Sequence, residues 1–436
     1  MMRALCVLLA ALASGATQSV PPPLVHNGTQ IAATQALVRA GDPAVLRAVA
    51  AAVRAGDAAL TRGPWSVTQC PHTPPDGDAR SYYSIAKYYW PCNANPCHKS
   101  APSCSPAGLP WVDCDGRVNP VINDYALPRV TNMSAAVSDL AQAYLWTGNS
   151  SYAERAAQLV RVFFLDPESG MHPQMNFAQV EPGSNGGNGS HWGIIELSAV
   201  LVSEVLDSLS FIAPSGAWTA ADQASWLLWL AAMGGWLRTS ELGAQEAVAF
   251  NNHQIWYTVM LAGIDVWTGD TASAVALLRG TLEPPPAGNA NAPLGVQIAR
   301  DGELPEEEAR TNSGGYVNFG TSALQQLGDI SRSQALAIAG APDLLAYVTK
   351  SNGSSIQAAV DFMAPFASGE NTSWPFQNIT DTPWSTFTEE FMRAANTAGW
   401  QARRQAYAAV VAALKPKADD PRALFWPVPA AAAARS

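Results

Sequence analysis

An Asn-Asn-His sequence at residues 251–253 places three polar side chains directly before an apolar stretch, Ile255 to Ile264. The apolar stretch predicts a buried helix with the polar residues at its start. One asparagine can cap this helix, because its side-chain oxygen accepts hydrogen bonds from unpaired backbone N–H groups. A second asparagine and a histidine that reach into a cleft would supply donors for an anionic or sugar ligand. Helix capping with core packing, and a ligand site, are the two interpretations of this segment.

A second polar segment, residues 301–319, combines several acidic side chains with Arg310, Tyr316 and the glycine pair Gly314-Gly315. Taken alone, it is typical of a solvated acidic loop. Its mixture of carboxylates, a guanidinium and a phenol could also form part of a chemical site.

Both segments resemble motifs of the alginate lyase family of polysaccharide lyases. The similarity rests on Asn251-Asn252-His253 followed by Trp256, and on Asp301-Gly302, Pro305, Glu307, Ala309-Arg310-Thr311, Tyr316 and Asn318-Phe319. Further blocks follow in the same order along the chain, from about residue 41 to about residue 400. They are Gly63 to Val67, Tyr82 to Pro91, Asp115 to Pro120, Phe164 to Pro167, Met171 to Gln179, Gly193 to Glu196 and Trp374 to Gln377.

The resemblance implies an all-α fold, an incomplete α/α toroid of antiparallel helix pairs with long loops over a central cleft. It also implies cleavage of uronic-acid polymers by β-elimination, which leaves a 4,5-unsaturated sugar. The C5 proton of a uronate becomes removable only when the neighbouring carboxylate is neutralised, so donors must gather around that carboxylate. Carried over to this chain, Asn252, His253 and Arg310 would hold the carboxylate, and Tyr316 would protonate the leaving O4. This chemistry needs no metal or organic cofactor.

The identity of the base depends on the stereochemistry of the sugar. Where the C5 hydrogen and the C4 oxygen lie on the same side, as in mannuronate, one tyrosine can act as base and then as acid. Where they lie on opposite faces, His253 would be the base. An unperturbed phenol has a pKa of about 10, so Tyr316 could be the base only if a cation, such as Arg310, favours its phenolate.

Several other residues are candidates for sugar contact. Asn176 and Gln179 resemble the family's substrate-facing block, although His172 and Phe177 stand where Asn and Tyr are more usual. Aromatic side chains could stack against sugar rings or pack in the core. The full set of expected substrate-binding residues is Asn176, Gln179, Tyr88, Trp90, His191 and Trp256.

Two rival functions remain open on these residues. The first is an inverting glycoside hydrolase on a similar toroid, with Glu303, Glu307 or Glu196 as acid and base. The second is a polysaccharide-binding protein without catalytic activity. Glu306 before Glu307, and Gly314-Gly315 before Tyr316, depart from the family pattern, which puts the substrate preference in doubt more than the reaction type.

The composition agrees with a helical enzyme and narrows its partners. Hydrophobic residues make up 48% of the 436 residues and charged residues only 14%, so the chain can bury a large core. Abundant alanine and few uninterrupted Val/Ile runs favour helices over sheets. The net charge of −10 disfavours nucleic acid as a partner, and an acidic polysaccharide would need a local basic site.

Helical periodicity predicts the elements that position these residues. Two helices are expected between Thr29 and Leu60, broken at Gly41-Asp42-Pro43, and polar loops at Gly183–His191, Pro284–Pro293 and Arg300–Gly320. The other expected helices are Met133–Trp146, Tyr152–Phe164, Gly193–Ile212, Ala220–Leu237, Ala244–Trp267, Thr271–Leu282, Thr321–Ile338, Ile356–Phe366 and Thr386–Leu414.

The N-terminal residues predict an exported protein. Residues 1–16 have the charged start, apolar run and small residues of a secretory signal, and no later stretch is long and apolar enough to span a bilayer. The expected domains are this signal, a catalytic toroid over residues 17–428 and a loose tail over 429–436. A Cys- and Pro-rich loop at residues 68–128 lies within the toroid.

The cysteines and glycosylation motifs also favour a secreted glycoprotein of unknown oligomeric state. Cys70, Cys92, Cys97, Cys104 and Cys114 share the 68–128 loop, where disulfides with one leftover thiol are favoured over a zinc site, since only His98 is near. Seven Asn-x-Ser/Thr motifs are possible N-glycan acceptors. They begin at Asn27, Asn132, Asn149, Asn188, Asn352, Asn371 and Asn378.

Overall fold

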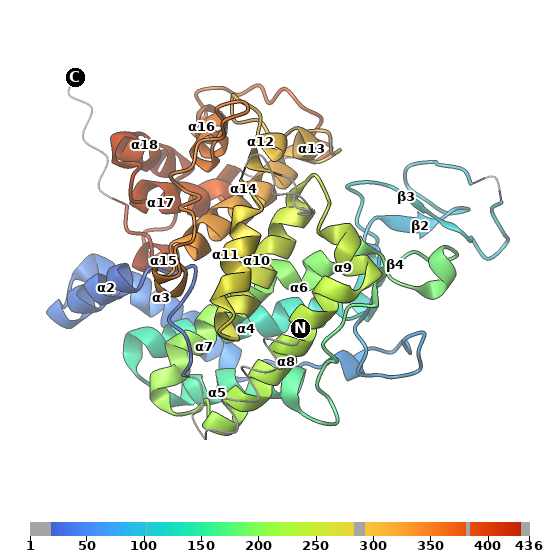
Figure 1. The fold of residues 1–436 in the computed structure, drawn as a ribbon, viewed down its shortest axis with the longest axis horizontal. Helices are drawn as coiled ribbons and strands as arrows, with labels where there is room; N and C mark the ends of the chain where they lie inside the picture. The colour runs from blue at the N-terminus through green and yellow to red at the C-terminus, as the bar shows by residue number, and fades with distance from the viewer. Residues whose placement is uncertain (1–18, 102, 283–292, 381–383, 429–436) are drawn as a thin grey trace.

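The computed structural model describes residues 19–101, 103–282, 293–380 and 384–428, and helices dominate these ranges (Figure 1). The expected signal at residues 1–16, the tail at 429–436 and most of the expected loop at Pro284–Pro293 lie outside the described residues.

The first helices form where capping residues stop and restart the chain. α2 (Gly28–Ala40) is capped by the side chain of Asn27 and ends at Gly41, which adopts the left-handed conformation that glycine tolerates best. Asp42 then caps α3 (Pro43–Leu60), so the predicted break between these two helices is confirmed. α4 (Leu127–Thr147) begins six residues before the predicted start, because Pro128 occupies its first turn, where proline needs no hydrogen-bond partner.

Inner helices surround the middle of the molecule and outer helices pack against them, which confirms the α/α toroid (Figure 1). The inner set is α4, α6 (Ile195–Val200), α10 (Asn252–Trp267), α14 (Ser313–Ser331) and α17 (Thr388–Asn396). The outer set includes α3, α5 (Ser150–Val160), α8 (Ala220–Thr239), α11 (Thr271–Arg279), α16 (Ile356–Ala367) and α18 (Arg404–Leu414). One continuous hydrophobic core joins the two layers.

Short helices and wider turns complete the ring. A π-helical segment at Leu201–Leu206 separates α6 from α7 (Asp207–Ile212), so the predicted helix at Gly193–Ile212 is interrupted. A similar segment, Arg161–Leu165, follows α5. The remaining short α-helices are α9 (Glu241–Glu246), α12 (Leu294–Gln297), α13 (Pro305–Glu308) and α15 (Gln334–Ile338).

Three predicted boundaries are wrong in ways that matter for function. The predicted helix Ala244–Trp267 breaks between α9 and α10, where the Asn251 side chain caps α10 by accepting from the His253 N–H at 3.2 Å. The predicted loop Arg300–Gly320 contains α13 and the first turns of α14. Tyr316 is therefore held on a helix, in spite of the two preceding glycines. The predicted helix Thr386–Leu414 is divided into α17 and α18.

Two small sheets lie together at one side of the ring (Figure 1). β1 (Tyr83–Ile85) pairs in parallel with β4 (Phe177–Val180), and β2 (Tyr89–Pro91) pairs antiparallel with β3 (Trp111–Asp113). Regular strands thus occur within the Cys- and Pro-rich segment, where little regular structure was expected.

Disulfides Cys92–Cys104 and Cys97–Cys114 hold the arm that β2 and β3 form, and Cys70 is the one free thiol among the described residues. The prediction of disulfides with one unpaired cysteine is confirmed, and the zinc alternative is wrong because four of the thiols are consumed in pairs. Within the described ranges, no helix is both long and apolar enough to cross a bilayer.

Gly302 supports the turn that leads into α13. Its φ of +95° is rarely adopted by other residues, and a Cβ there would collide with the backbone oxygen of Ala358 at the start of α16. We expect Gly302→Ala to lower the free energy of unfolding by about 3 kcal/mol, since strain and a backbone clash add. Chemical denaturation measures this loss.

Gly340→Ala is the matched control, because Gly340 has a φ of +76° but open space where the Cβ would be. Gly340→Ala should lower the free energy of unfolding by clearly less than Gly302→Ala does. Equal losses for the two variants would show that the contact with α16 does not matter.

Candidate active site

A cavity of about 570 Å³ opens at the N-terminal ends of the inner helices. Residues in the first turns of α4, α10 and α14 line it, so the positive ends of these helix dipoles face the cavity and favour an anionic ligand. Lining residues from the helices and from the β2–β3 side include Lys87, Tyr88, Tyr89, Asp113, Asp115, Gln179, Trp192, Glu196, Asn251, Asn252, His253, Arg310, Tyr316 and Phe319.

Asn252 is fixed by the carboxylate of Glu307. One carboxylate oxygen of Glu307 accepts from the Asn252 backbone N–H and the other from its side-chain Nδ2, both at 2.6 Å. Both residues are buried, and the Oδ1 atom of Asn252 has no partner. Burial raises the pKa of Glu307 to about 7, although the two bonds from Asn252 oppose the rise.

His253 is oriented by the buried carboxylate of Glu246. One oxygen of Glu246 lies 2.8 Å from Nδ1 of His253, and the other lies 2.8 Å from Nδ1 of His191. Burial opposes ionisation of Glu246, but the two histidines hold its pKa below the ordinary value. An ionised carboxylate accepts the Nδ1 proton, so Nε2 of His253 keeps its lone pair for a proton from elsewhere.

Arg310 and Tyr316 form a second cluster across the cavity lining. The guanidinium donates to the carboxylate of Asp115 and, at 2.8 Å, to the Tyr316 hydroxyl, while its carbon lies 3.8 Å from the centre of the Tyr316 ring. The Tyr316 hydroxyl donates in turn to the Tyr88 hydroxyl at 2.7 Å. Asp115 follows Cys114 directly, so the disulfide to Cys97 helps to hold this cluster in place.

The pKa of Tyr316 is raised rather than lowered. Burial is the largest cause and the neighbouring Tyr88 adds to it, whereas Arg310 acts in the opposite direction without prevailing. Asp115 partly neutralises Arg310, which weakens its effect on the phenol. The neutral phenol, rather than the phenolate, is therefore the favoured form of Tyr316 in this site.

The floor of the cavity is built around Glu196. Its carboxylate accepts from Tyr82 at 2.9 Å and from Ser84 at 2.6 Å, and burial raises its pKa to about 7. Ser84 also accepts from the backbone N–H of Gln179, which holds a φ of +47°. A strained backbone of this kind persists only where surrounding contacts impose it.

The structure places the predicted site residues in two groups. Asn252, His253, Arg310, Tyr316, Tyr88 and Gln179 line the one cavity. Four residues expected to contact sugar do not line it, and three of them use their polar groups elsewhere.

Asn176 accepts from Trp236, Trp90 donates to the backbone of Arg117, and His191 is bound to Glu246. Trp256 is buried against Phe319. Their expected sugar contacts gain no support from the cavity lining and stay a prediction.

Sequence reasoning missed the carboxylates that hold the site. Glu246 and Asp115 had no assigned role, although Asp115 begins one of the recognised blocks, and Glu307 was considered only as a family position or a hydrolase acid. Lys87 and Trp192 also line the cavity. The position of Asp115 directly after Cys114 could have indicated its role in the site. No sequence pattern indicates that Glu246 bonds to two histidines.

Carboxylates in this site are not arranged as the acid and base of an inverting hydrolase. Glu307 is used by Asn252, Glu196 is used by Tyr82 and Ser84, and Glu303 does not line the cavity. The groups that remain for chemistry are an imidazole with a free nitrogen, a neutral phenol, a guanidinium and amide donors. This set can bind a carboxylate and move a proton on each side of a neighbouring bond.

Comparisons with known proteins show the family of the chain. The model of the alginate lyase family matches residues 66–374. A crystal structure of an alginate lyase from Bacteroides ovatus aligns with a TM-score of 0.81 and 26% identity, covering 94% of this chain and 100% of that chain.

Alginate lyase A1-III from Sphingomonas species A1 aligns at 16% identity over 93% of this chain and 98% of that chain. Its TM-score of 0.45 carries no weight. No curated protein matches the sequence. With its family model covering most of the chain, the protein belongs to the alginate lyase family.

Proposed function

We propose that this lyase cleaves a polyuronate, such as mannuronate-rich alginate or glucuronan, by β-elimination to leave a 4,5-unsaturated uronate end. The observation that carries the proposal is that Asn252, His253, Arg310 and Tyr316, from two distant segments, line a single cavity. The helix N-termini at that cavity and the side chain of Lys87 supply the local positive potential that an acidic protein needs to hold an acidic polymer.

Neutralisation of the substrate carboxylate is the first task of the site. Arg310 uses Nε and one terminal nitrogen on Asp115 and Tyr316, so its other terminal nitrogen can donate to the carboxylate. The amide of Asn252 adds a neutral donor. As the C5 proton leaves, negative charge spreads onto the carboxylate oxygens, and these donors then bind more strongly than in the ground state.

Where the C5 hydrogen and O4 lie on opposite faces of the sugar, proton transfer is divided between two residues in this proposal. Nε2 of His253 takes the C5 proton, the electron pair forms the C4–C5 double bond, and the C4–O4 bond breaks. The Tyr316 hydroxyl gives its proton to O4, for which a raised pKa is suitable because it keeps the phenol protonated until the bond breaks. Transfer of the proton from the imidazolium to the phenolate through solvent restores the enzyme. Where the C5 hydrogen and O4 lie on the same side, as in mannuronate, Tyr316 takes the C5 proton and returns it to O4.

Export and N-glycosylation are part of the proposal. Asn132 and Asn149 are exposed, as glycan acceptors must be. Asn352 is the exception, because its Nδ2 atom donates to the backbone oxygens of Gly295 and Ile298 at 3.0 Å. We expect that acceptor to stay unmodified when the others are glycosylated.

Tyr316→Phe tests the acid. Removing the hydroxyl should lower kcat about 1000-fold, since the leaving O4 loses its proton donor, while polymer binding changes little. Ultraviolet absorbance of the unsaturated product measures turnover on mannuronan, guluronan and glucuronan. Tyr144→Phe, at the far end of α4, is the matched control and should keep full activity.

Three outcomes would contradict the proposal. Unchanged elimination by Tyr316→Phe would remove its role as acid. Cleavage without ultraviolet absorbance would indicate hydrolysis. Polymer binding without any cleavage by the wild type would indicate a binding protein.

Glu246→Gln tests the orientation of the base. The amide keeps the shape of the side chain but removes the negative charge that supports a protonated His253, so kcat should fall about 10- to 100-fold. The acidic limb of the pH–rate profile should move to lower pH, because the imidazole loses a counter-charge. A fall in rate with an unmoved acidic limb would mean that Glu246 is structural only.

The protonation state of Glu307 decides in this proposal whether Oδ1 or Nδ2 of Asn252 points at the substrate. The unpartnered Oδ1 of Asn252 finds a donor if Glu307 is protonated and the amide turns, which points Nδ2 at the substrate carboxylate. The pKa of about 7 makes the protonated form available. Because this pKa is raised, protonated Glu307 is present below pH 7 and is lost as the pH rises through 7.

Glu307→Gln mimics the protonated acid, because its amide can both donate to Oδ1 and accept from the backbone N–H. We expect this variant to keep activity within about threefold and to lose the part of the pH dependence centred near pH 7, whereas Glu307→Ala should lose about 100-fold. Equal losses in both variants, measured from pH–rate profiles, would overturn this role.

A further inference from the structure

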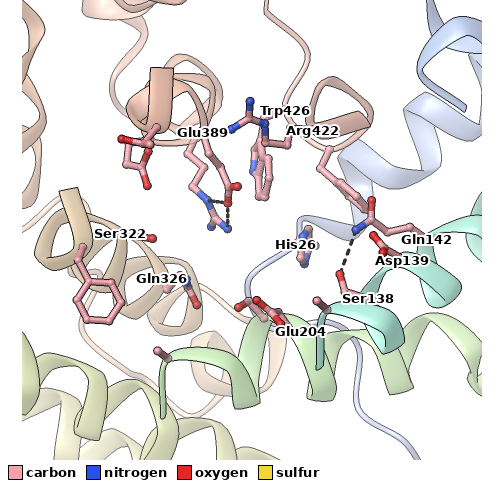
Figure 2. Close-up of a pocket in the computed structure, with 18 of the residues that line it drawn as sticks. His26, Ser138, Asp139, Gln142, Glu204, Ser322, Gln326, Glu389, Arg422 and Trp426 are labelled. Atoms are coloured by element: carbon pink, nitrogen blue, oxygen red, sulfur yellow. Dashed lines mark hydrogen bonds and ion pairs between the residues drawn. The ribbon is translucent and has the colours of Figure 1, made fainter. Parts of the chain in front are cut away.

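A second cavity, which we call the lower cavity, is lined by residues further along the inner helices and is shown in Figure 2. It has a volume of about 420 Å³ and shares the lining residues Ala199 and Phe319 with the active-site cavity. Its other polar lining residues include Ser138, Asp139, Glu204, Gln326, Glu389 and Glu390.

The same four helices line both cavities in the same order. On α4, Thr131 lines the upper cavity and Ser138 the lower; on α14, Tyr316 lines the upper and Gln326 the lower. α10 and the α6 segment follow the same order. Ten residues of helix separate Tyr316 from Gln326, which at 1.5 Å per residue is about 15 Å. Gln326 in the lower cavity therefore lies well away from Tyr316, while Ala199 and Phe319 line both cavities.

Negative charge dominates the lower cavity. The π-helical segment after α6 carries Glu204 and α17 carries Glu389, and both line the cavity (Figure 2). Glu390, the next residue of α17, lines it too. The lining cations are already paired: Arg393 binds Glu389 at 2.9 Å and Asp329 at 2.8 Å, and Arg422 binds Asp420 at 2.7 Å. Among the residues that the structure describes, no ion pair joins Glu204 or Glu390 to a cation. Glu204 accepts from the Ser134 hydroxyl, and Arg393 and Arg422 act on Glu390 only from a distance, where they oppose the rise of its pKa.

Two buried acceptors that line the lower cavity have no hydrogen-bond partner. They are Oε2 of Glu390 and Oε1 of Gln326, on side chains that are 4% and 6% exposed. Buried acceptors without partners cost free energy, so they indicate a donor that is supplied from outside the chain. The N–H of Trp256, another lining residue, is also unpartnered and calls for an acceptor.

The chemistry of the walls favours an organic cation over a metal ion. Within the described residues, no three His, Cys, Asp or Glu side chains are placed to hold a metal. Trp256, Phe319 and Trp426 supply aromatic surface, which packs against a carbon skeleton and attracts an ammonium group. The side chains of Asp139 and Glu389 remain about one third exposed, at 34% and 32%, which leaves a route in from solvent.

We propose that the lower cavity binds a small hydroxylated ammonium compound, of the amino sugar or amino alcohol class. The ammonium group lies between Glu204 and Glu390 and donates to Gln326, and a hydroxyl accepts from Trp256. The raised pKa of Glu204, about 7 through burial and the nearby Glu389 and Asp139, is consistent with a carboxyl that lacks this counter-charge in the empty cavity.

Calorimetric titration with glucosamine, and with glucose as the uncharged match, tests the proposal at neutral pH. We expect glucosamine to bind at one site and glucose to bind at least about tenfold more weakly, because only the ammonium group meets the carboxylates. Saturation of Tyr316→Phe with uncleaved polyuronate should leave glucosamine binding intact. This readout does not depend on activity, so it stands or fails separately from the proposed elimination.

Glu204→Gln and Glu390→Gln should each weaken glucosamine binding about tenfold, and both amides preserve the shape of the cavity. Glu154→Gln, an exposed change on α5, is the control and should bind as the wild type does. Equal affinity for glucose and glucosamine, displacement of glucosamine by the polymer, or wild-type binding in both cavity variants would each overturn the proposal.

Discussion

The carboxylate of Glu307 accepts hydrogen bonds from both the backbone N–H and the side chain of Asn252 and so fixes the start of α10. The rest of the site depends on this contact. It joins the two polar segments of the sequence, because Glu307 lies on α13 and Asn252 begins the helix that also carries His253. Without it, the Asn252 side chain and the first N–H of α10 would be left without an acceptor in a dry interior. The contact thus fixes both the position of the amide and the end of the helix.

Carboxylates elsewhere in the site act in the same way, as supports for other side chains. Glu246 orients two imidazoles, Asp115 holds Arg310 and the following turn, and Glu196 binds two hydroxyls. An enzyme that binds an anion would be expected to avoid acids near its ligand. Here each acid is neutralised by its own partners or kept near neutrality by burial, and the helix N-termini provide positive potential.

The toroid makes such a site possible because its inner helices point the same way. Their first turns gather at the upper cavity, and residues further along the same helices line a lower cavity of opposite charge preference. One ring of helices therefore produces two polar cavities along its interior, which share the lining residues Ala199 and Phe319. The π-helical turn after α6 brings Glu204 to the lower one.

The sequence by itself determined the helical class, the paired helices, the use of the cysteines and six residues that come together in one cavity. These features depend on local periodicity, capping and motifs. Only the tertiary structure decided the start of α14, the break before α10, and the removal of Asn176, Trp90, His191 and Trp256 from the cleft lining.

It also revealed the partners Glu246 and Asp115 and the raised pKa of Tyr316. The reason is that burial and long-range pairing, such as the contact of Asp115 with Arg310 across 195 residues, arise from packing and leave no periodic signal in the chain.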